Sequence, residues 1–122
     1  MSGGVEMTLD DFNIIIEKRI NIIRQSLAEK GHEYADNGKD RLAVFKNVAK
    51  LRRTTSINAV GGMVAKQIVS LFDMLDKTTK VDDQFEYVIS TKHLWEERIK
   101  DIINYMILLD AVIQDIQESE DD

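Results

Sequence analysis

The sequence predicts an all-α protein, a helical bundle of about four main helices that associates into a homo-oligomer. Three observations support this class. Apolar residues recur at steps of three and four over long stretches, which is the period of an amphipathic helix. Pro is absent and only 7% of the residues are aromatic, whereas a β-sandwich needs turn residues every ~8–12 positions. The 122 residues are enough for one domain and too few for two ordinary ones.

The first predicted helix covers Leu9–Glu29, after a polar, Gly-rich segment (residues 1–7) that we expect to be a disordered tail. Thr8 and Asp11 have the spacing of a capping box, and Gly31 suits a left-handed residue that ends the helix. Its apolar residues are Phe12, Ile15, Ile16, Ile20, Ile22, Ile23 and Leu27. A helix that is apolar over so much of its circumference buries two sides, so we expect one side to face another subunit.

A polar connection over residues 30–39, with a predicted turn at Asn37-Gly38, leads to a second helix over Arg41–Leu51. We expect Asp40 to cap this helix. Arg41 lies in the first turn, where the helix dipole does not favour a cation, so it is expected to have a partner. That partner is either a structural carboxylate or a ligand. The inward residues are Leu42, Phe45, Val48 and Ala49.

The third predicted helix covers Ile57–Lys77 and contains a local conflict at Gly61-Gly62. Two glycines in a helix interior cost about 2 kcal/mol relative to alanines. Either the backbone approaches a neighbouring helix closely here, or the glycines belong to a phosphate-cradling loop, although their spacing matches no known phosphate-loop signature. The apolar stripe of this helix consists of Val60, Val64, Ile68, Leu71 and Leu75.

The last predicted helix is the longest and covers Ser90–Gln117, with Ser90 or Thr91 as its cap. Residues 81–89 before it form either a short helix or an irregular segment over the bundle end. Residues 118–122 are predicted to be a disordered acidic tail, so the single domain covers residues 8–117. The apolar stripe of the long helix consists of Trp95, Ile99, Ile102, Met106, Leu109 and Ile113.

Charge and composition exclude several classes of protein. The net charge of −6 excludes a general nucleic-acid binder, which needs a basic surface. The basic group formed by Lys46, Lys50, Arg52 and Arg53 is interpreted either as cations favoured at a helix C-terminus or as a phosphate-binding patch. The absence of Cys excludes disulfides and thiolate metal sites. No apolar run reaches the ~18 residues of a membrane span and no secretory signal is visible, so we expect a cytoplasmic protein without a membrane partner.

Charged residues on the last two long helices form the candidate site. Glu97 and Asp101 lie four residues apart beside an apolar stripe, where a carboxylate must stay hydrated, meet a cation or become protonated. Lys66 and Asp73 share a face of the third helix. If the two helices pack together, three carboxylates and one amine border a common groove, which suits Mg²⁺. The alternative is a semi-buried network in which Lys66 pairs with Glu97 or Asp101.

An ordered set of segments resembles a known family. The segments are Asp40-Arg41-Leu42-x-x-Phe45-Lys46, Gly61-Gly62-Met63-Val64-Ala65-Lys66, Asp73-Met74 and Trp95-Glu96-Glu97-Arg98-Ile99-Lys100-Asp101, followed by Asn104-Tyr105 and Leu108-Leu109. This set resembles a family of small bacteriophage proteins related to the nucleotide-modification-associated domain and, more remotely, to MazG-like all-α nucleotide pyrophosphohydrolases.

The resemblance implies an oligomeric all-α bundle with a polar groove for a nucleotide. In the hydrolases, acidic residues on two helices hold Mg²⁺, which polarises the phosphates for attack by water. Glu97 and Asp101 match the pair on the second of those helices and would be the catalytic and metal-binding residues. Lys66 and Asp73 stand where the first helix carries Glu-x-x-Glu, a departure that removes expected ligands.

The leading hypothesis is therefore binding of a nucleotide or nucleotide-like phosphate ligand in a polar interhelical groove. Arg41 and Lys66 would meet the anion. Asp73, Glu97 and Asp101 would hold Mg²⁺ or fix those cations, and Trp95 and Tyr105 would form the pocket wall. One alternative is a Mg²⁺-dependent nucleoside triphosphate pyrophosphohydrolase. Another is a non-enzymatic factor that binds a host protein and counters host defence, acting in the host cytoplasm if the chain is phage-encoded.

Overall fold

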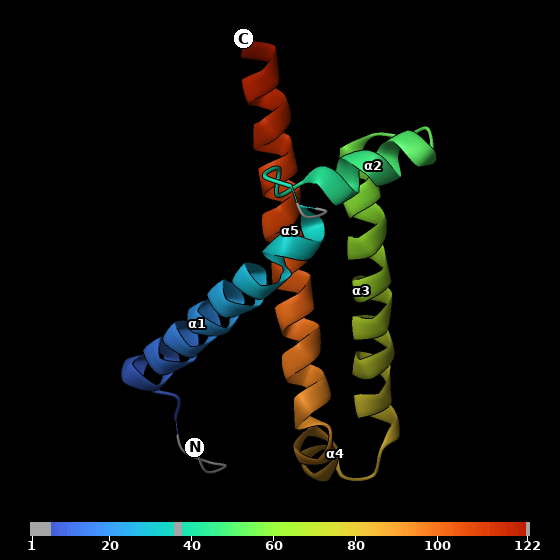
Figure 1. Cartoon of the computed structure of the whole chain (residues 1–122). Coiled ribbons are helices and arrows are strands. Elements are labelled where there is room, and N and C mark those ends of the chain that lie inside the picture. The colour runs from blue at the N-terminus through green and yellow to red at the C-terminus, as the bar shows by residue number, and fades with distance from the viewer. Residues whose placement is uncertain (1–5, 36–37, 122) are drawn as a thin grey trace.

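The computed structural model describes residues 6–35 and 38–121, and these residues contain five helices and no strand (Figure 1). The helices are α1 (Leu9–Tyr34), α2 (Ala43–Leu51), α3 (Ser56–Lys80), α4 (Gln84–Ser90) and α5 (Lys92–Asp121). The prediction of an all-α protein is confirmed. No helix in the described ranges is both long enough and apolar enough to cross a membrane.

The long helices α3 and α5 run antiparallel side by side, and α4 connects them at one end (Figure 1). At the other end α2 lies across the start of α3, and its own start is near α5 (Figure 1). Helix α1 crosses α5 at an angle and contacts α5 and α2, and in the described part of the chain it contacts neither α3 nor α4. Its N-terminal half diverges from α5, so the fold has a closed end and an open side (Figure 1).

The start of α1 is as predicted and its end is not. The Thr8 hydroxyl accepts a hydrogen bond from the Asp11 amide, and the Asp11 carboxylate accepts one from the Thr8 amide, both at 3.1 Å. The predicted end at Gly31 is wrong, because α1 continues to Tyr34. A Cβ at position 31 would lie 3.0 Å from Nη1 of Arg41, so this glycine makes room for a guanidinium instead of ending the helix.

The connection between α1 and α2 differs in detail from the prediction. Asn37 of the predicted turn lies outside the described residues, and the Gly38 amide donates to the Ala35 carbonyl at 2.9 Å. Helix α2 begins at Ala43 without a side-chain cap. Asp40 instead accepts a hydrogen bond from the Leu42 amide at 3.0 Å, so it stabilises the turn before the helix.

The caps of α4 and α5 agree only in part with those predicted from the sequence. Of the two alternatives for residues 81–89, the short helix is correct, and Asp83 caps it by accepting from the Glu86 amide. Ser90 and Thr91 do not serve as the predicted cap of α5, because both hydroxyls donate to the Tyr87 carbonyl. Helix α5 extends past the predicted end to Asp121, and Asp122, like residues 1–5 of the predicted tail, lies outside the described residues.

Gly61 and Gly62 lie inside α3, in a continuous helix. A Cβ built at either position would meet nothing within 4 Å. Among the described residues, therefore, no neighbouring helix comes close enough to require glycine at these positions, and the glycines lie in a helix instead of a loop.

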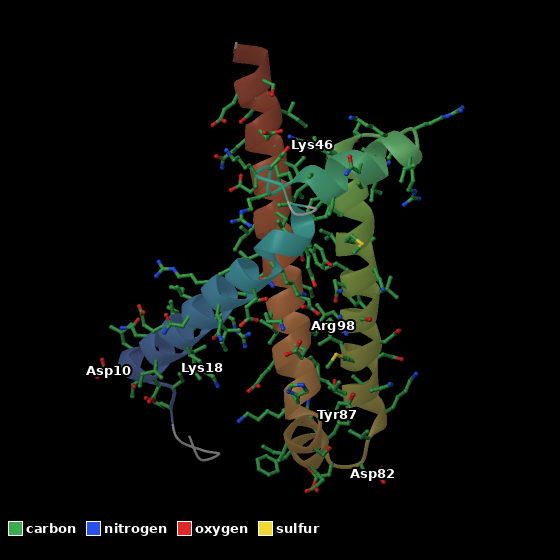
Figure 2. The ribbon with its side chains drawn as sticks, in the orientation of Figure 1. Asp10, Lys18, Lys46, Asp82, Tyr87 and Arg98 are labelled. Atoms are coloured by element: carbon green, nitrogen blue, oxygen red, sulfur yellow. The ribbon has the colours of Figure 1, made fainter. Side chains whose placement is uncertain are left out.

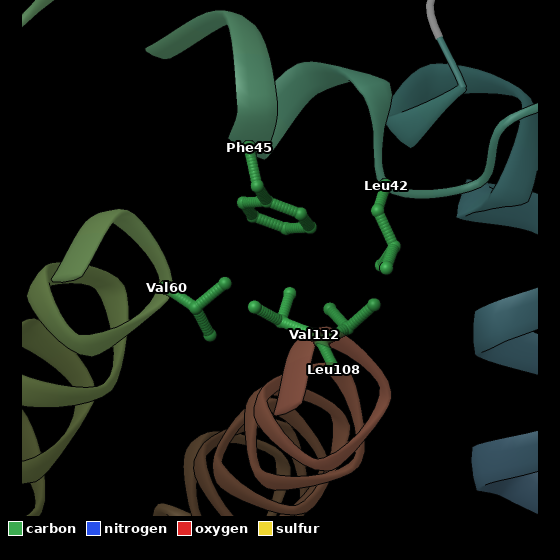
Figure 3. Close-up of a cluster of buried hydrophobic side chains, with 5 residues drawn as sticks. All are labelled: Leu42, Phe45, Val60, Leu108 and Val112. Carbon is green, nitrogen blue, oxygen red and sulfur yellow. The ribbon is translucent and has the colours of Figure 1, made fainter. Parts of the chain in front are cut away.

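The core lies at the closed end, where three helices meet (Figure 3). Val60 of α3 and Val112 of α5 are the most completely buried apolar side chains, at 0% and 2% exposure. Phe45 of α2 covers them, and the Tyr34 ring of α1 packs 5.3 Å from the Phe45 ring, measured between centroids. The core cluster consists of Leu42, Phe45, Val60, Leu108 and Val112.

Candidate functional site

The three carboxylates of the predicted metal site do not form a group in one copy of the chain. In the described residues no three His, Cys, Asp or Glu side chains lie together as a metal ion requires. Glu97 pairs with Lys100 on its own helix at 2.7 Å. The Lys100 ammonium lowers the pKa of Glu97, so this carboxylate is ionised and bound to a neighbour. Lys66 and Asp73 are exposed on α3, and no ion pair connects either residue to the described part of α5.

Arg98 occupies the position in which Lys66 was expected. It lies on α5 and faces α3 (Figure 2), where its guanidinium donates to the side-chain oxygen of Gln67. The same guanidinium is 3.9 Å from the Asp101 carboxylate, and both side chains are largely buried. Asp101 therefore has a cation on its own helix. The sequence contained the signal, because residues three apart on a helix are neighbours.

Two buried donors near this pair lack a partner among the described protein atoms: Nε1 of Trp95 and Nε of Arg98. Buried polar groups normally have a hydrogen-bond partner, either protein or water. Trp95 was predicted to form a pocket wall. The seam between α3 and α5 thus offers two N–H groups one helical turn apart, both suited to an acceptor atom.

One predicted site residue, Arg41, lies at a hollow where the end of α1 meets the start of α2 and α5. A hollow of about 300 Å³ is lined by Leu27, Ala28, Gly31, Tyr34, Arg41 and Leu108. We call it the Arg41 hollow. The Arg41 guanidinium packs over Gly31, as the fold requires, and Tyr34 forms part of the wall. Among the described residues no carboxylate lies within 4.0 Å of this guanidinium, so its positive charge is available at the hollow.

Tyr34 connects the Arg41 hollow to two further predicted residues. Burial raises the pKa of Tyr34, and with the smaller contributions of Tyr105 and of the charges of Glu33 and Asp101 it reaches about 12. The phenol is therefore neutral at physiological pH and can donate a hydrogen bond. Sequence reasoning missed Tyr34, because the helix was expected to end at Gly31 and residue 34 was assigned to a loop.

The basic group at the end of α2 divides into two parts. Lys46 pairs with Asp40 at 2.6 Å and with Asp115 of α5 at 3.2 Å, so it ties the connection and α2 to α5 (Figure 2). Arg52 and Arg53, which has a left-handed φ of 54°, line a second hollow of about 400 Å³. Its other lining residues are Thr54, Asn58 and Gly62. We call it the Arg53 hollow.

Comparison of this chain with protein family models, with curated proteins and with solved structures found no match.

Proposed function

We propose that this chain binds a nucleotide or nucleotide-like phosphate ligand in the Arg41 hollow and acts as a homo-oligomer. The single observation that supports the ligand is the pairing of an available guanidinium with an apolar and aromatic wall. Arg41 offers a planar fork of donors to a phosphate. Leu27, Leu108 and the Tyr34 ring offer a surface for a base.

The size of the hollow agrees with this proposal. Small-molecule sites occupy about 300–1,000 Å³ and are mostly apolar with a few polar groups that fix orientation. At about 300 Å³ the Arg41 hollow accommodates part of a nucleotide, with the remainder in solvent. Arg41 would fix the phosphate end, and the phenol of Tyr34 would donate a hydrogen bond to the ligand.

The proposal includes a Mg²⁺ ion that binds together with the phosphates of the ligand. Mg²⁺ typically takes only one or two protein carboxylates and completes its shell with water and phosphate oxygens. Asp101 is the predicted metal ligand whose charge contributes to the raised pKa of Tyr34, so the proposal assigns the Mg²⁺ contact to it. The roles predicted for Glu97 and Asp73 as metal ligands, and for Lys66 as an anion ligand, stay predictions.

Thermal melting of the purified chain tests the proposal, with a panel of nucleotides at saturating concentration with and without Mg²⁺. A ligand at a hundred times its dissociation constant stabilises by about 2.7 kcal/mol. Arg41→Gln is expected to weaken binding roughly tenfold or more, since hydrogen bonds to charged groups contribute about 1.5–3 kcal/mol. Asp101→Ala is expected to remove the Mg²⁺-dependent part of the shift while the helical content stays intact.

Arg53→Gln is the matched control, because it removes the same charge from the Arg53 hollow. If Arg53→Gln abolishes the melting shift and Arg41→Gln preserves it, the ligand site is the Arg53 hollow and the assignment to Arg41 is wrong. If no nucleotide raises the melting temperature of the parent, ligand binding is wrong and the protein-interaction alternative gains support. Steady release of pyrophosphate from nucleoside triphosphates would favour the hydrolase alternative.

A further inference from the structure

The single chain exposes far more surface than a compact protein of its mass. A folded monomer of 14.0 kDa is expected to expose about 6,700 Å². This chain exposes 9149 Å², roughly 2,400 Å² more than that expectation. Large apolar side chains are exposed on all five helices, and among them are two stripes that the sequence marks for burial.

The first stripe lies on the N-terminal half of α1. Phe12, Ile16 and Ile20 are 51%, 40% and 38% exposed. They share a face with Ile23, which is buried, and with Leu27, which packs against the core cluster. The stripe is therefore continuous, and α1 buries only its C-terminal part in its own chain. The N-terminal part is less covered because α1 diverges from α5 towards its start, beyond the contact of Arg19 with the Glu96 carbonyl at 3.4 Å (Figure 1).

The second stripe lies on α5. Ile99, Met106 and Ile113 follow one another at intervals of seven residues and are 40%, 49% and 38% exposed. A seven-residue apolar repeat is the pattern of a helix that packs lengthwise against another helix. In the described part of the chain these three side chains are only partly covered, although α3 and α1 both contact α5.

An apolar hollow of about 270 Å³ lies between the two helices that carry these stripes. Its lining combines Ile20 and Ile23 of α1 with Ile103 and Ile107 of α5, and Arg19 and Arg24 stand at its edge. This concave apolar surface between two diverging helices, which we call the seat, fits side chains of a further helix.

We infer that a second copy of this chain covers these stripes, so that α1 and α5 of two copies form one shared four-helix core. Homodimer interfaces typically bury about 2,000–5,000 Å² in total, counting both partners. The excess of roughly 2,400 Å² per chain matches the upper part of that range when both copies contribute it. A two-fold dimer presents the same patch twice, so each copy supplies both the stripe and the seat.

Charge favours a second copy over a lipid surface. Helices that lie on membranes are rich in Lys and Arg on their polar face. The open half of α1 carries Asp10, Asp11 and Glu17 against Lys18 and Arg19, and the chain has a net charge of −6. The dimer rests on the homo-oligomer of the proposed function and specifies it, but it does not involve the Arg41 hollow, so failure of the dimer leaves ligand binding in that hollow standing.

Sedimentation equilibrium of the full chain at about 50 µM tests the inference. The expected result is a mass twice 14.0 kDa for the parent. Ile16→Lys and Met106→Lys, each on one stripe, are expected to shift the population to monomer, with at least a tenfold rise in the dissociation constant. Asn21→Lys adds the same charge to an exposed position on another face of α1 and is expected to leave the dimer intact.

A monomer mass for the parent at that concentration would overturn the inference, and so would a parent-like dimer in both stripe variants. A monomer that floats with vesicles of anionic lipid would assign the stripes to a membrane surface and also overturn it. If a stripe variant loses its helical circular dichroism signal, the dimer is tested on the parent chain alone, by its melting temperature at several protein concentrations. The melting temperature of a dimer rises with protein concentration. A melting temperature that is constant over a hundredfold range of concentration would contradict the dimer.

Discussion

The closed end of the molecule and the open half of α1 contain the same kinds of side chain in different surroundings. At the closed end, Val60, Phe45 and Val112 come from three helices and exclude water from one another (Figure 3). On the open half, Phe12 and Ile16 lie on one helix and are 51% and 40% exposed. Helical periodicity therefore identifies which residues require burial and does not identify which chain provides it.

The largest effect is expected at the closed end. Phe45→Ala removes an aromatic ring that is 4% exposed and contacts the Tyr34 ring. Burial of such a ring in a core contributes about 3–5 kcal/mol, so the free energy of unfolding should fall by that amount. Urea denaturation followed by circular dichroism measures it. The control is Leu51→Ala, at a position that is 85% exposed. It should change the free energy of unfolding by no more than about 0.5 kcal/mol.

A smaller effect is expected where α1 crosses α5, the boundary between the closed and open regions. The side-chain amide of Asn104 donates to the Ser26 hydroxyl at 2.8 Å, and both residues are buried. Ser26→Ala removes the acceptor, and an unsatisfied buried donor costs about 1–3 kcal/mol. Equal urea midpoints for this variant and the parent would show that water replaces the hydroxyl and that the crossing is less closed than its geometry indicates.

A titration to alkaline pH tests whether Tyr34, at the Arg41 hollow, is buried as the closed end of the molecule requires. Burial raises the pKa of Tyr34 to about 12 in the folded chain, above the value of about 10 in an unfolded chain. The contribution of this phenol to the free energy of unfolding is therefore complete below about pH 10. It is lost as the pH rises towards about 12. Phenolate absorbance should show one tyrosine titrating late, and Tyr34→Phe should remove that step. Three normal titrations in the parent would contradict the burial of Tyr34.

The smallest effect is expected at the glycines of α3. A Cβ at Gly62 meets nothing within 4 Å, and alanine is the better helix former. Gly62→Ala should therefore raise the free energy of unfolding by about 0.4–1 kcal/mol, as measured by thermal melting at fixed protein concentration. A loss of stability would instead indicate that another chain approaches α3 at this position and would enlarge the interface between copies.

Much of the fold could be predicted from the sequence because its signals are local. The Thr8–Asp11 cap and the apolar stripes depend on residues three and four apart, so the helices were found nearly at their observed positions. The end of α1 was predicted wrongly because a glycine can either end a helix or make room for a neighbouring side chain. Gly31 makes room for Arg41, which comes from another segment of the chain.

The candidate site was predicted less well, for a geometric reason. Arg41 lines a hollow together with Tyr34, and Tyr105 and Asp101 contribute to the raised pKa of Tyr34, whereas the roles predicted for these residues stay predictions. Lys66 and Asp73 were expected to face Asp101 because they share a face of α3, but the spacing within one helix does not specify its rotation against the next. Arg98 meets Gln67 and Asp101 in that seam instead.

Amide hydrogen exchange along α1 at several protein concentrations tests the central claim most directly, namely that the open half of α1 is covered by a second copy. The account predicts that amides of residues 12–20 are protected at high concentration and lose protection on dilution, whereas amides of residues 59–64 in α3 change little. Rapid exchange of residues 12–20 at every concentration, with α3 still protected, would contradict it.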